Sequence, residues 1–312
     1  MPERSRVVSS WDVVGVGANS VDFVYLVPGY PERHGAFSKM RISGQRVCAG
    51  GQMATALATC ARLGLRAKYI GATGNDANGA LIRERLGSLG IDTTSVVTRK
   101  GHNQFAVILV DQSSGERIVL WDRDERLQLD ACDVADEVIA EARLVHVDDT
   151  DQPAAIRAAR LARERGIPCT SDLDRLTDRT EELVAAVSVP IFADSLPNAL
   201  TGARDPESAL RHLRRHHDGL LVVTLGSRGA MALDGDRLIQ VPGFAVQAVD
   251  TTGAGDVFRG GFIYGLLQQW SVDRVLRFAN AAAAVSCTRT GALDGVPSLE
   301  DIVRLGGSRP TT

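Results

Sequence analysis

Hydrophobic and polar positions follow two alternating periods along most of this chain. Short apolar runs typical of buried strands, such as residues 13–17 and 220–224, are separated by stretches whose apolar residues recur every three to four positions. Residues 52–63 show this helical period, and Gly64 follows them as a helix C-cap. Because strands that alternate with helices are joined by crossover connections, the pattern predicts an α/β fold: a doubly wound, mainly parallel sheet flanked by helices.

Two β-rich pieces, at residues 19–46 and 104–121, do not follow this rhythm. The second contains two apolar runs joined through the turn at 112–115, which is typical of a hairpin. We expect the two pieces to form one small discontinuous β-sheet, a lid packed over the end of the main sheet. The chain would then be a single domain spanning residues 1–312, with a lid sub-domain drawn from about 19–46 and 95–123.

Composition and charge place the chain among ordinary globular proteins. Of its 312 residues, 44% are hydrophobic and 23% are charged, and a net charge of −3 argues against a general nucleic-acid binder, which usually carries a basic excess. No apolar run approaches the ~18 residues of a membrane span, and the first ten residues lack the apolar segment of a signal peptide. We therefore expect a soluble, cytoplasmic protein without nucleic-acid or membrane partners.

The cysteines agree with a reducing compartment. They are odd in number and widely spaced, and none forms a CxxC pair, so neither a disulfide framework nor a zinc site is expected. The five positions are Cys48, Cys60, Cys132, Cys169 and Cys287.

The stretch of residues 249–258 carries the strongest chemical signal. Gly253 and Gly255, separated by Ala254, leave the backbone unshielded at the start of a predicted helix, where unpaired N–H groups and the helix dipole favour an anion. Asp256 falls in the first turn, where it can accept a hydroxyl proton and direct the oxygen at phosphorus. The stretch indicates phosphoryl transfer; a glycine-rich turn capped by an acid is the structural alternative.

Two further small-residue segments are candidates for ligand contact. Gly50 and Gly51 open the helix that precedes Gly64, and an apolar strand ends in the turn formed by residues 224–229. Ligands of open α/β sheets bind at the carboxyl ends of strands, although each segment also fits a plain turn. The chain has no Gly-Lys pair, which excludes a Walker A loop, and strand-like residues follow the partial dinucleotide fingerprint at 15–20, which argues against a nicotinamide site.

In this order, and over essentially the whole chain, these segments resemble the ribokinase-like (PfkB-type) family of carbohydrate kinases. Residues 250–258, followed by Gly260-Gly261, are similar to the family's second signature, and residues 50–64 to its first. Residues 224–229 resemble its nucleotide segment, and residues 278–292 its closing helix and adenine-side loop. The resemblance implies the ribokinase-like fold and phosphoryl transfer from ATP with Mg²⁺.

The resemblance also implies roles for individual residues. Asp256 would be the catalytic base. Asp250 and Thr252 fall where many members hold a monovalent cation such as K⁺ through backbone oxygens. The anion hole would consist of Gly253, Ala254 and Gly255. The residues that would border ATP, the last of them beside the adenine, are Thr224, Gly226, Ser227, Gly229 and Asn280.

Two departures from the family concern the substrate and the metal. Thr55 stands where the family usually has an asparagine that touches the sugar, so the identity of the sugar stays open. The usual Asn-x-x-Glu, linked to magnesium and phosphate, is missing, and Asp194 is the residue that would partly replace it through water.

The resemblance implies a sugar-contacting acid at Asp148, but its neighbour Asp149 could also occupy that position. The residues implied to contact the substrate are Asp22, Gly50, Gly51, Thr55, Asp148 and Arg123.

Arg123 has two interpretations. In relatives that phosphorylate acidic keto-sugars, an arginine near this position binds the substrate's carboxylate in the bidentate geometry that suits a guanidinium. The alternative, which the local sequence favours, is a surface arginine paired with one of the acids next to it, Asp122, Asp124 or Glu125.

We therefore expect an ATP- and Mg²⁺-dependent kinase that phosphorylates a primary hydroxyl of a small sugar or keto-sugar acid of the ribose, fructose or 2-keto-3-deoxygluconate type. A nucleoside (adenosine-type) kinase of the same fold and a non-catalytic sugar-binding regulator on the kinase scaffold remain alternatives. The lid would present unpaired strand edges, which proteins usually cover, so we also expect a homodimer whose lids pack together, in agreement with the family resemblance.

Overall fold

The computed structural model describes residues 9–114 and 116–306, and a long twisted sheet forms its centre. Two four-stranded groups, β4–β1–β9–β10 and β11–β12–β13–β14, meet through parallel bridges between Thr170 and Val189 and between Leu173 and Phe192. Strand β13 runs antiparallel to both of its neighbours, β12 and β14, and all other neighbouring strands are parallel. The strands are β1 (Trp11–Val16), β4 (Ala67–Ile70), β9 (Ala142–Asp148), β10 (Cys169–Asp172), β11 (Ile191–Phe192), β12 (Leu221–Thr224), β13 (Ala230–Asp234) and β14 (Arg237–Val241).

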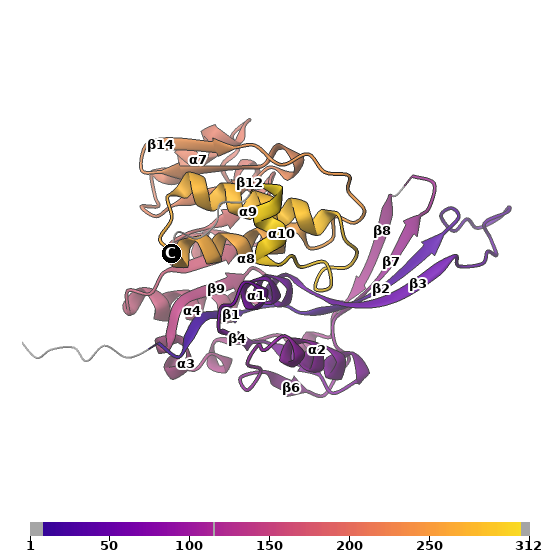
Figure 1. The fold of residues 1–312 in the computed structure, drawn as a ribbon. Coiled ribbons are helices and arrows are strands. Elements are labelled where there is room, and N and C mark those ends of the chain that lie inside the picture. The colour runs from indigo at the N-terminus through magenta and orange to yellow at the C-terminus, as the bar shows by residue number, and fades with distance from the viewer. Residues whose placement is uncertain (1–8, 115, 307–312) are drawn as a thin grey trace, which may run out of the picture.

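Helices cover both faces of this sheet (Figure 1), which confirms the predicted doubly wound α/β fold. One layer contains α1, α8 and α9, and the other contains α3, α4 and α7. None of the helices in the described part of the chain is long and apolar enough to cross a bilayer. The helices are α1 (Gln52–Arg62), α2 (Ala77–Ser88), α3 (Asp136–Ala140), α4 (Gln152–Glu164), α5 (Thr180–Ala186), α6 (Leu196–Thr201), α7 (Pro206–Arg214), α8 (Ala254–Leu267), α9 (Val272–Cys287) and α10 (Leu299–Leu305).

A second four-stranded sheet projects from the body, in the order β3–β2–β7–β8 (Figure 1). Its strands are β2 (Ser20–Val27), β3 (Gly44–Gly50), β7 (Phe105–Asp111) and β8 (Arg117–Asp122). The hairpin expected between the last two is present, although Gly115 in its turn lies outside the described residues. Two short strands, β5 (Ala72–Gly74) and β6 (Val97–Arg99), pair with each other in a separate small sheet. We call the projecting four-stranded sheet the lid.

Helices α1 and α8 pack against each other on one face of the main sheet. The approach is close, because a Cβ atom on Gly260 would lie 2.4 Å from Cβ of Thr59. Their amino ends therefore lie side by side, where β1, β9 and β10 end and the lid begins. Carboxyl ends of parallel strands next to helix N-termini are where open α/β sheets bind ligands.

Candidate active site

The first feature of the site is the amino end of α8. Gly253 is the N-cap residue, with φ 77° and ψ 1°, a left-handed conformation that glycine adopts without steric cost. Asp256 is the third residue of the helix, and residues 253–256 all remain partly exposed. The first N–H groups of the helix are therefore open to a ligand, with a carboxylate beside them.

Asp256 lies among other acids. Burial raises the pKa of its carboxyl, the charges of Asp148 and Asp174 raise it further, and Arg259 opposes the shift. Arg259 itself forms an ion pair with Asp172, and Asp256 takes part in no salt bridge among the residues described. A carboxyl with a raised pKa that is not held by a cation is a suitable general base, because it binds a proton more strongly than an ordinary aspartate does.

The residues predicted to bind the sugar meet beside this helix. A Cβ atom on Gly50 would lie 2.9 Å from Oδ2 of Asp22, and one on Gly253 would lie 3.3 Å from Cγ2 of Thr55. Asp22 is buried, which raises its pKa, and it accepts a hydrogen bond of 3.1 Å from Ser20 Oγ. Thr55 Oγ1 is buried and has no hydrogen-bond partner among the described residues. The start of β2, the end of β3 and α1 thus bring three predicted contacts next to the anion hole.

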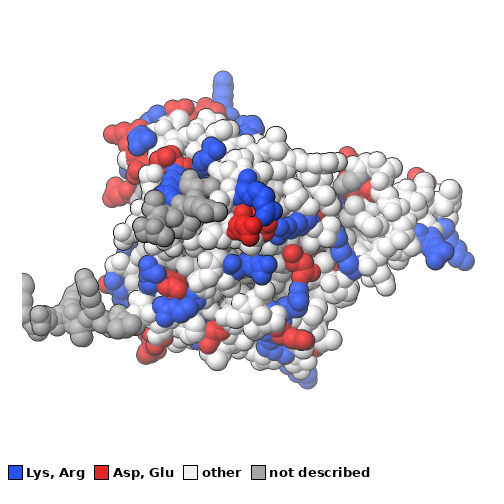
Figure 2. Space-filling model, viewed as in Figure 1, with Lys and Arg blue, Asp and Glu red and all other residues white. Residues whose placement is uncertain are grey.

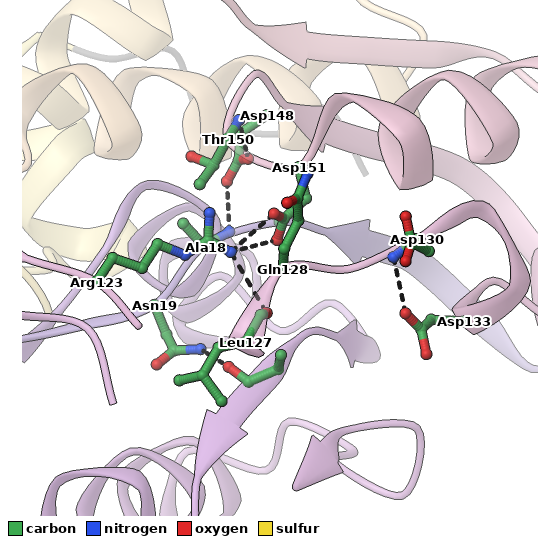
Figure 3. Close-up of polar contacts among 12 residues, drawn as sticks. Ala18, Asn19, Arg123, Leu127, Gln128, Asp130, Asp133, Asp148, Thr150 and Asp151 are labelled. Carbon is green, nitrogen blue, oxygen red and sulfur yellow. Dashed lines mark hydrogen bonds and ion pairs between the residues drawn. The ribbon is translucent and has the colours of Figure 1, made fainter. Parts of the chain in front are cut away.

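Asp148 lies at the end of β9 on the same side. Its carboxylate accepts hydrogen bonds from the N–H groups of Ala18 (2.7 Å) and Thr150 (3.0 Å), as Figure 3 shows. Burial raises the pKa of Asp148 to about 7. Its neighbour Asp149 instead accepts from the N–H groups of Asp174 and Arg175, both at 2.8 Å, and so fixes the loop after β10. The two adjacent acids therefore have different surroundings.

Arg123 pairs with a different acid from those that the local sequence suggests. Its Nη2 lies 2.7 Å from both carboxylate oxygens of Asp151, the N-cap residue of α4, whose side chain is 2% exposed. The expected partners Asp122, Asp124 and Glu125 are therefore incorrect. Figure 3 shows Arg123 reaching from the end of the lid into the loop that carries Asp148. A direct contact between Arg123 and the substrate stays a prediction.

The residues predicted to border ATP form a second group, at the other end of the sheet. Gly229 has φ 95°, and a Cβ atom on it would lie 2.1 Å from the carbonyl oxygen of Val241. Asn280 donates from Nδ2 to the carbonyl oxygens of Val241 (3.0 Å) and Pro242 (3.2 Å). Both residues therefore meet at the end of β14, which brings the 224–229 turn and α9 together.

Two arginines of the lid reach the loop before the anion hole. Arg46 Nη2 lies 3.4 Å from Oδ2 of Asp250, and Arg117 Nη1 donates to the hydroxyls of Thr251 (3.2 Å) and Thr252 (3.0 Å). Asp250 also accepts from the N–H groups of Thr252 and Gly291, so its side chain is fully engaged. A cation at this loop would therefore depend on backbone oxygens, as the family resemblance implies.

A cleft of about 440 Å³ lies between the lid and this loop. Four aliphatic side chains line it from the lid, and four charged side chains of the lid and the loop also line it. The aliphatic residues are Val24, Leu26, Ile108 and Val110, and the charged ones are Asp22, Arg46, Arg117 and Asp250.

The described residues hold no group of three or more His, Cys, Asp or Glu side chains that could bind a metal ion. Asp194, the expected substitute for the missing Asn-x-x-Glu, forms a two-oxygen ion pair with Arg228 at 2.9–3.0 Å. Asp174 is a different candidate, because it is exposed and close enough to Asp256 to raise its pKa. One or two carboxylates together with phosphate oxygens suffice for Mg²⁺, so the site fits a magnesium ion that enters with ATP.

Sequence reasoning missed Asp172 and Arg259, although each carries a signal. In residues 257–263 of α8, every residue except Arg259 is apolar or glycine. A charged side chain in such a buried segment needs a partner of opposite charge. Asp172 ends a buried strand next to the strand that ends in Asp148. The roles of Arg46 and Arg117 were also missed. Their contacts with the loop at 250–252 depend on how the lid lies relative to the body, which the sequence does not indicate.

Comparison with known proteins agrees with this geometry. The family model described as pfkB family carbohydrate kinase matches residues 12–299. An ATP-dependent ribose-1-phosphate kinase of Halopiger xanaduensis is 34% identical over 284 residues, covering 90% of this chain and 93% of the relative. A ribokinase of Haemophilus influenzae is 29% identical over 296 residues, covering 92% and 95%.

A solved structure extends the agreement to the fold. Arabidopsis thaliana ribokinase, solved with ribose and ATP, superposes with a TM-score of 0.80 at 25% identity, covering 95% of this chain and 98% of its own. The likeness therefore includes the main sheet and the lid. With the family match across nearly all of its length, this chain belongs to the pfkB family of carbohydrate kinases.

Proposed function

We propose that this kinase transfers the γ-phosphoryl group of ATP to a primary hydroxyl of a small sugar or keto-sugar acid. The observation that carries the proposal is the partly exposed end of α8, where open N–H groups and the carboxyl of Asp256 adjoin the residues Asp22, Gly50 and Thr55. The named relatives act on ribose-type sugars, which supports the substrate class.

Each group of site residues has its own role in the proposed transfer. Asp22, with backbone groups at Gly50 and Gly51, binds sugar hydroxyls, and Asp148 binds the far end of the sugar. Asp256 takes the proton of the attacking hydroxyl, while the N–H groups of residues 253–255 stabilise the charge that grows on the phosphoryl oxygens. The lid reduces the access of water to the cleft, which protects ATP from hydrolysis.

The nucleotide would lie along the turn at 224–229, with its adenine towards Asn280. Magnesium would neutralise phosphate charge when it is bound, and Asp174, an exposed acid whose charge raises the pKa of Asp256, would help to hold it. A monovalent cation held by backbone oxygens of Asp250 and Thr252 is part of the proposal. So is a cytoplasmic location, which the five free cysteines support.

A substrate panel tests the proposal. We expect ATP and Mg²⁺ to give ADP release that is stimulated by one of ribose, ribose-1-phosphate, fructose, 2-keto-3-deoxygluconate or adenosine, and the same compound to raise Tm in a thermal-shift assay. Compounds that raise Tm without ADP release would instead support the non-catalytic regulator. The outcome is read as the ratio of kcat/KM values across the panel.

Adenosine belongs in the panel because of one observation. The cleft is lined from the lid by an aliphatic surface that consists of Val24, Leu26, Ile108 and Val110. An apolar wall of this kind suits a nucleobase as well as the carbon face of a sugar. If adenosine gives the highest kcat/KM, the nucleoside-kinase alternative replaces the sugar kinase.

We further propose a homodimer formed through the lids. Strand β8 is an edge strand whose six residues are all exposed, and apolar side chains such as Val47 and Leu120 stand on the lid surface. Figure 2 shows few charged side chains on the visible face of the lid. A sheet edge with four exposed apolar residues at its centre (118–121) is normally covered, here by a second copy of the chain.

Light scattering tests the dimer. We expect the mass of a dimer for the wild type and of a monomer for Leu120→Glu, because a buried charge at the interface costs more than the contact provides. Leu176→Glu is the matched control, since Leu176 is 54% exposed on the body and Leu120 is 57% exposed on the lid. A monomeric wild type at working concentration would reject the proposal.

A further inference from the structure

Two arginines line the cleft from opposite edges of the lid. Arg46 lies on β3 and Arg117 on β8, the two outer strands of the projecting sheet in Figure 1. The aliphatic side chains that line the cleft belong to the inner strands, β2 and β7, and so lie between the two arginines. An apolar wall with a cation at each edge suits a ligand that combines a carbon face with a charged end.

The loop that these guanidinium groups face satisfies them incompletely. Among the described residues, each pairs with one acid, Asp250: Arg46 Nη2 is 3.4 Å from Oδ2, and Arg117 Nη1 is 4.0 Å from Oδ1. Strong charge-assisted hydrogen bonds are about 2.7–2.9 Å long. The Asp250 carboxylate already accepts from the N–H groups of Thr252 and Gly291, both at 2.9 Å, and Nε of Arg46 is buried without an acceptor. Two positive charges therefore face one carboxylate that has other partners.

The register of the lid sheet places both arginines beyond the proposed sugar contact, Asp22. Asp22 is opposite Cys48, and Arg46 lies two residues further out along β3, which is ~7 Å. Arg117 is level with Leu26, four residues or ~13 Å beyond Asp22, and its long side chain reaches back to the loop at 250–252. A small sugar held by Asp22 would therefore direct a substituent at its far end towards these arginines.

Arg123, which one interpretation of the sequence assigns to a charged substrate, is held differently. Its Nη2 bonds both oxygens of Asp151, whose side chain is 2% exposed. The side chains of Arg46 and Arg117 are 35% and 42% exposed, and both line the cleft. The cations that a ligand in the cleft can reach are therefore those of β3 and β8.

We propose that Arg46 and Arg117 form a subsite for an oxyanion of the sugar substrate, either a carboxylate or a phosphate ester. The inference rests on the proposed kinase function and narrows its substrate to an anionic sugar. A guanidinium can donate two parallel hydrogen bonds to an oxyanion, which is a stronger acceptor than the neutral hydroxyls of Thr251 and Thr252 that Arg117 contacts. The aliphatic wall limits water around the contact, which strengthens the attraction between the charges.

A comparison of charged and neutral sugars tests the subsite. The two pairs are ribose-1-phosphate with ribose, and 2-keto-3-deoxygluconate with fructose. In at least one pair we expect the charged compound to have a Kd about tenfold lower or more, measured by calorimetry without ATP, and a kcat/KM higher by a similar factor. The first pair reports on a phosphate and the second on a carboxylate, so the pair that responds identifies the source of the oxyanion.

Variants assign the preference to the two arginines. Arg46→Met and Arg117→Met should each raise the Kd and KM of the preferred charged compound by about tenfold or more, and change those of its neutral counterpart by less than about threefold. Lysine at either position keeps the charge without the planar fork, so it should recover part of the loss. Arg41→Met is the matched control, because Arg41 is an exposed arginine between β2 and β3 that does not line the cleft. Its values should equal those of the wild type.

Two results would overturn the subsite. One is a wild type that binds neither charged compound more tightly than its neutral counterpart, a comparison that needs no variant to fold. The other is a loss of binding in the methionine variants that is equal for charged and neutral compounds, as a packing role would produce. Selective binding of a charged sugar without turnover would reject the proposed kinase function and keep the subsite. Turnover of the neutral sugars alone would keep the kinase and reject the subsite.

Discussion

Replacing Asp256 by asparagine should lower kcat by about 10²–10⁴-fold, the usual contribution of a general base. The amide keeps the size of the side chain but cannot accept the hydroxyl proton. Because burial and nearby acids raise the pKa of Asp256, its ionised form opposes folding at pH values above the ordinary aspartate range. The neutral amide removes that cost, so Tm at pH 8 should stay the same or rise. Sugar binding, measured by thermal shift, should be retained.

The control for this variant is Asp273→Asn. Asp273 is also an acid in the first turn of a helix, α9, but it is exposed and distant from the anion hole. Its loss should change Tm by less than a few degrees and leave kcat within about twofold, because a single charge near a helix end contributes only about 0.3–1 kcal/mol. Turnover of Asp256→Asn close to that of Asp273→Asn would exclude Asp256 as the base.

The alternation of strands and helices could be predicted from hydrophobic periodicity, although three elements could not. Residues 52–63 have helical spacing and a clear C-terminal glycine, and the structure places a helix there, Gln52–Arg62, within one residue of the prediction. The strand β3 was not expected, because Gly44–Gly50 is rich in glycine and polar residues and pairs only because β2 lies beside it. Helices α5 and α6 are short and depend on packing against the sheet, so no period in the sequence indicates them.

The proposed catalytic half of the site could be located from the sequence, because it consists of adjacent residues. The sequence from Gly253 to Asp256 contains both the open backbone and the acid, and one helix N-terminus brings them together. Partners from distant segments were not predictable. Arg123 was expected to pair with a neighbour in sequence, but the fold brings it to Asp151, and the fold alone brings Asp172 under Arg259.

Replacing Gly253 by alanine should also lower activity strongly. Its φ of 77° costs an alanine about 1–2 kcal/mol, and the new Cβ would lie 2.8 Å from Cβ of Ala292, too close for either to stay in place. The start of α8 must then move away from the loop at 290–292, and the N–H groups lose their position relative to Asp256. Loss of one anion-hole donor costs about 10²–10³-fold in kcat, and we expect a decrease of at least that size.

A matched substitution separates this effect from backbone strain. Gly90 has the same φ of 77°, but a Cβ atom there would meet nothing within 4 Å. Gly90→Ala should lower Tm by an amount set by the strain alone and leave kcat unchanged, because Gly90 follows α2 far from the anion hole. Gly253→Ala should lower Tm by more than Gly90→Ala, since the contact with Ala292 adds to the strain. Equal kcat values for the two variants would show that the N–H groups at the start of α8 do not stabilise the transferred phosphoryl group.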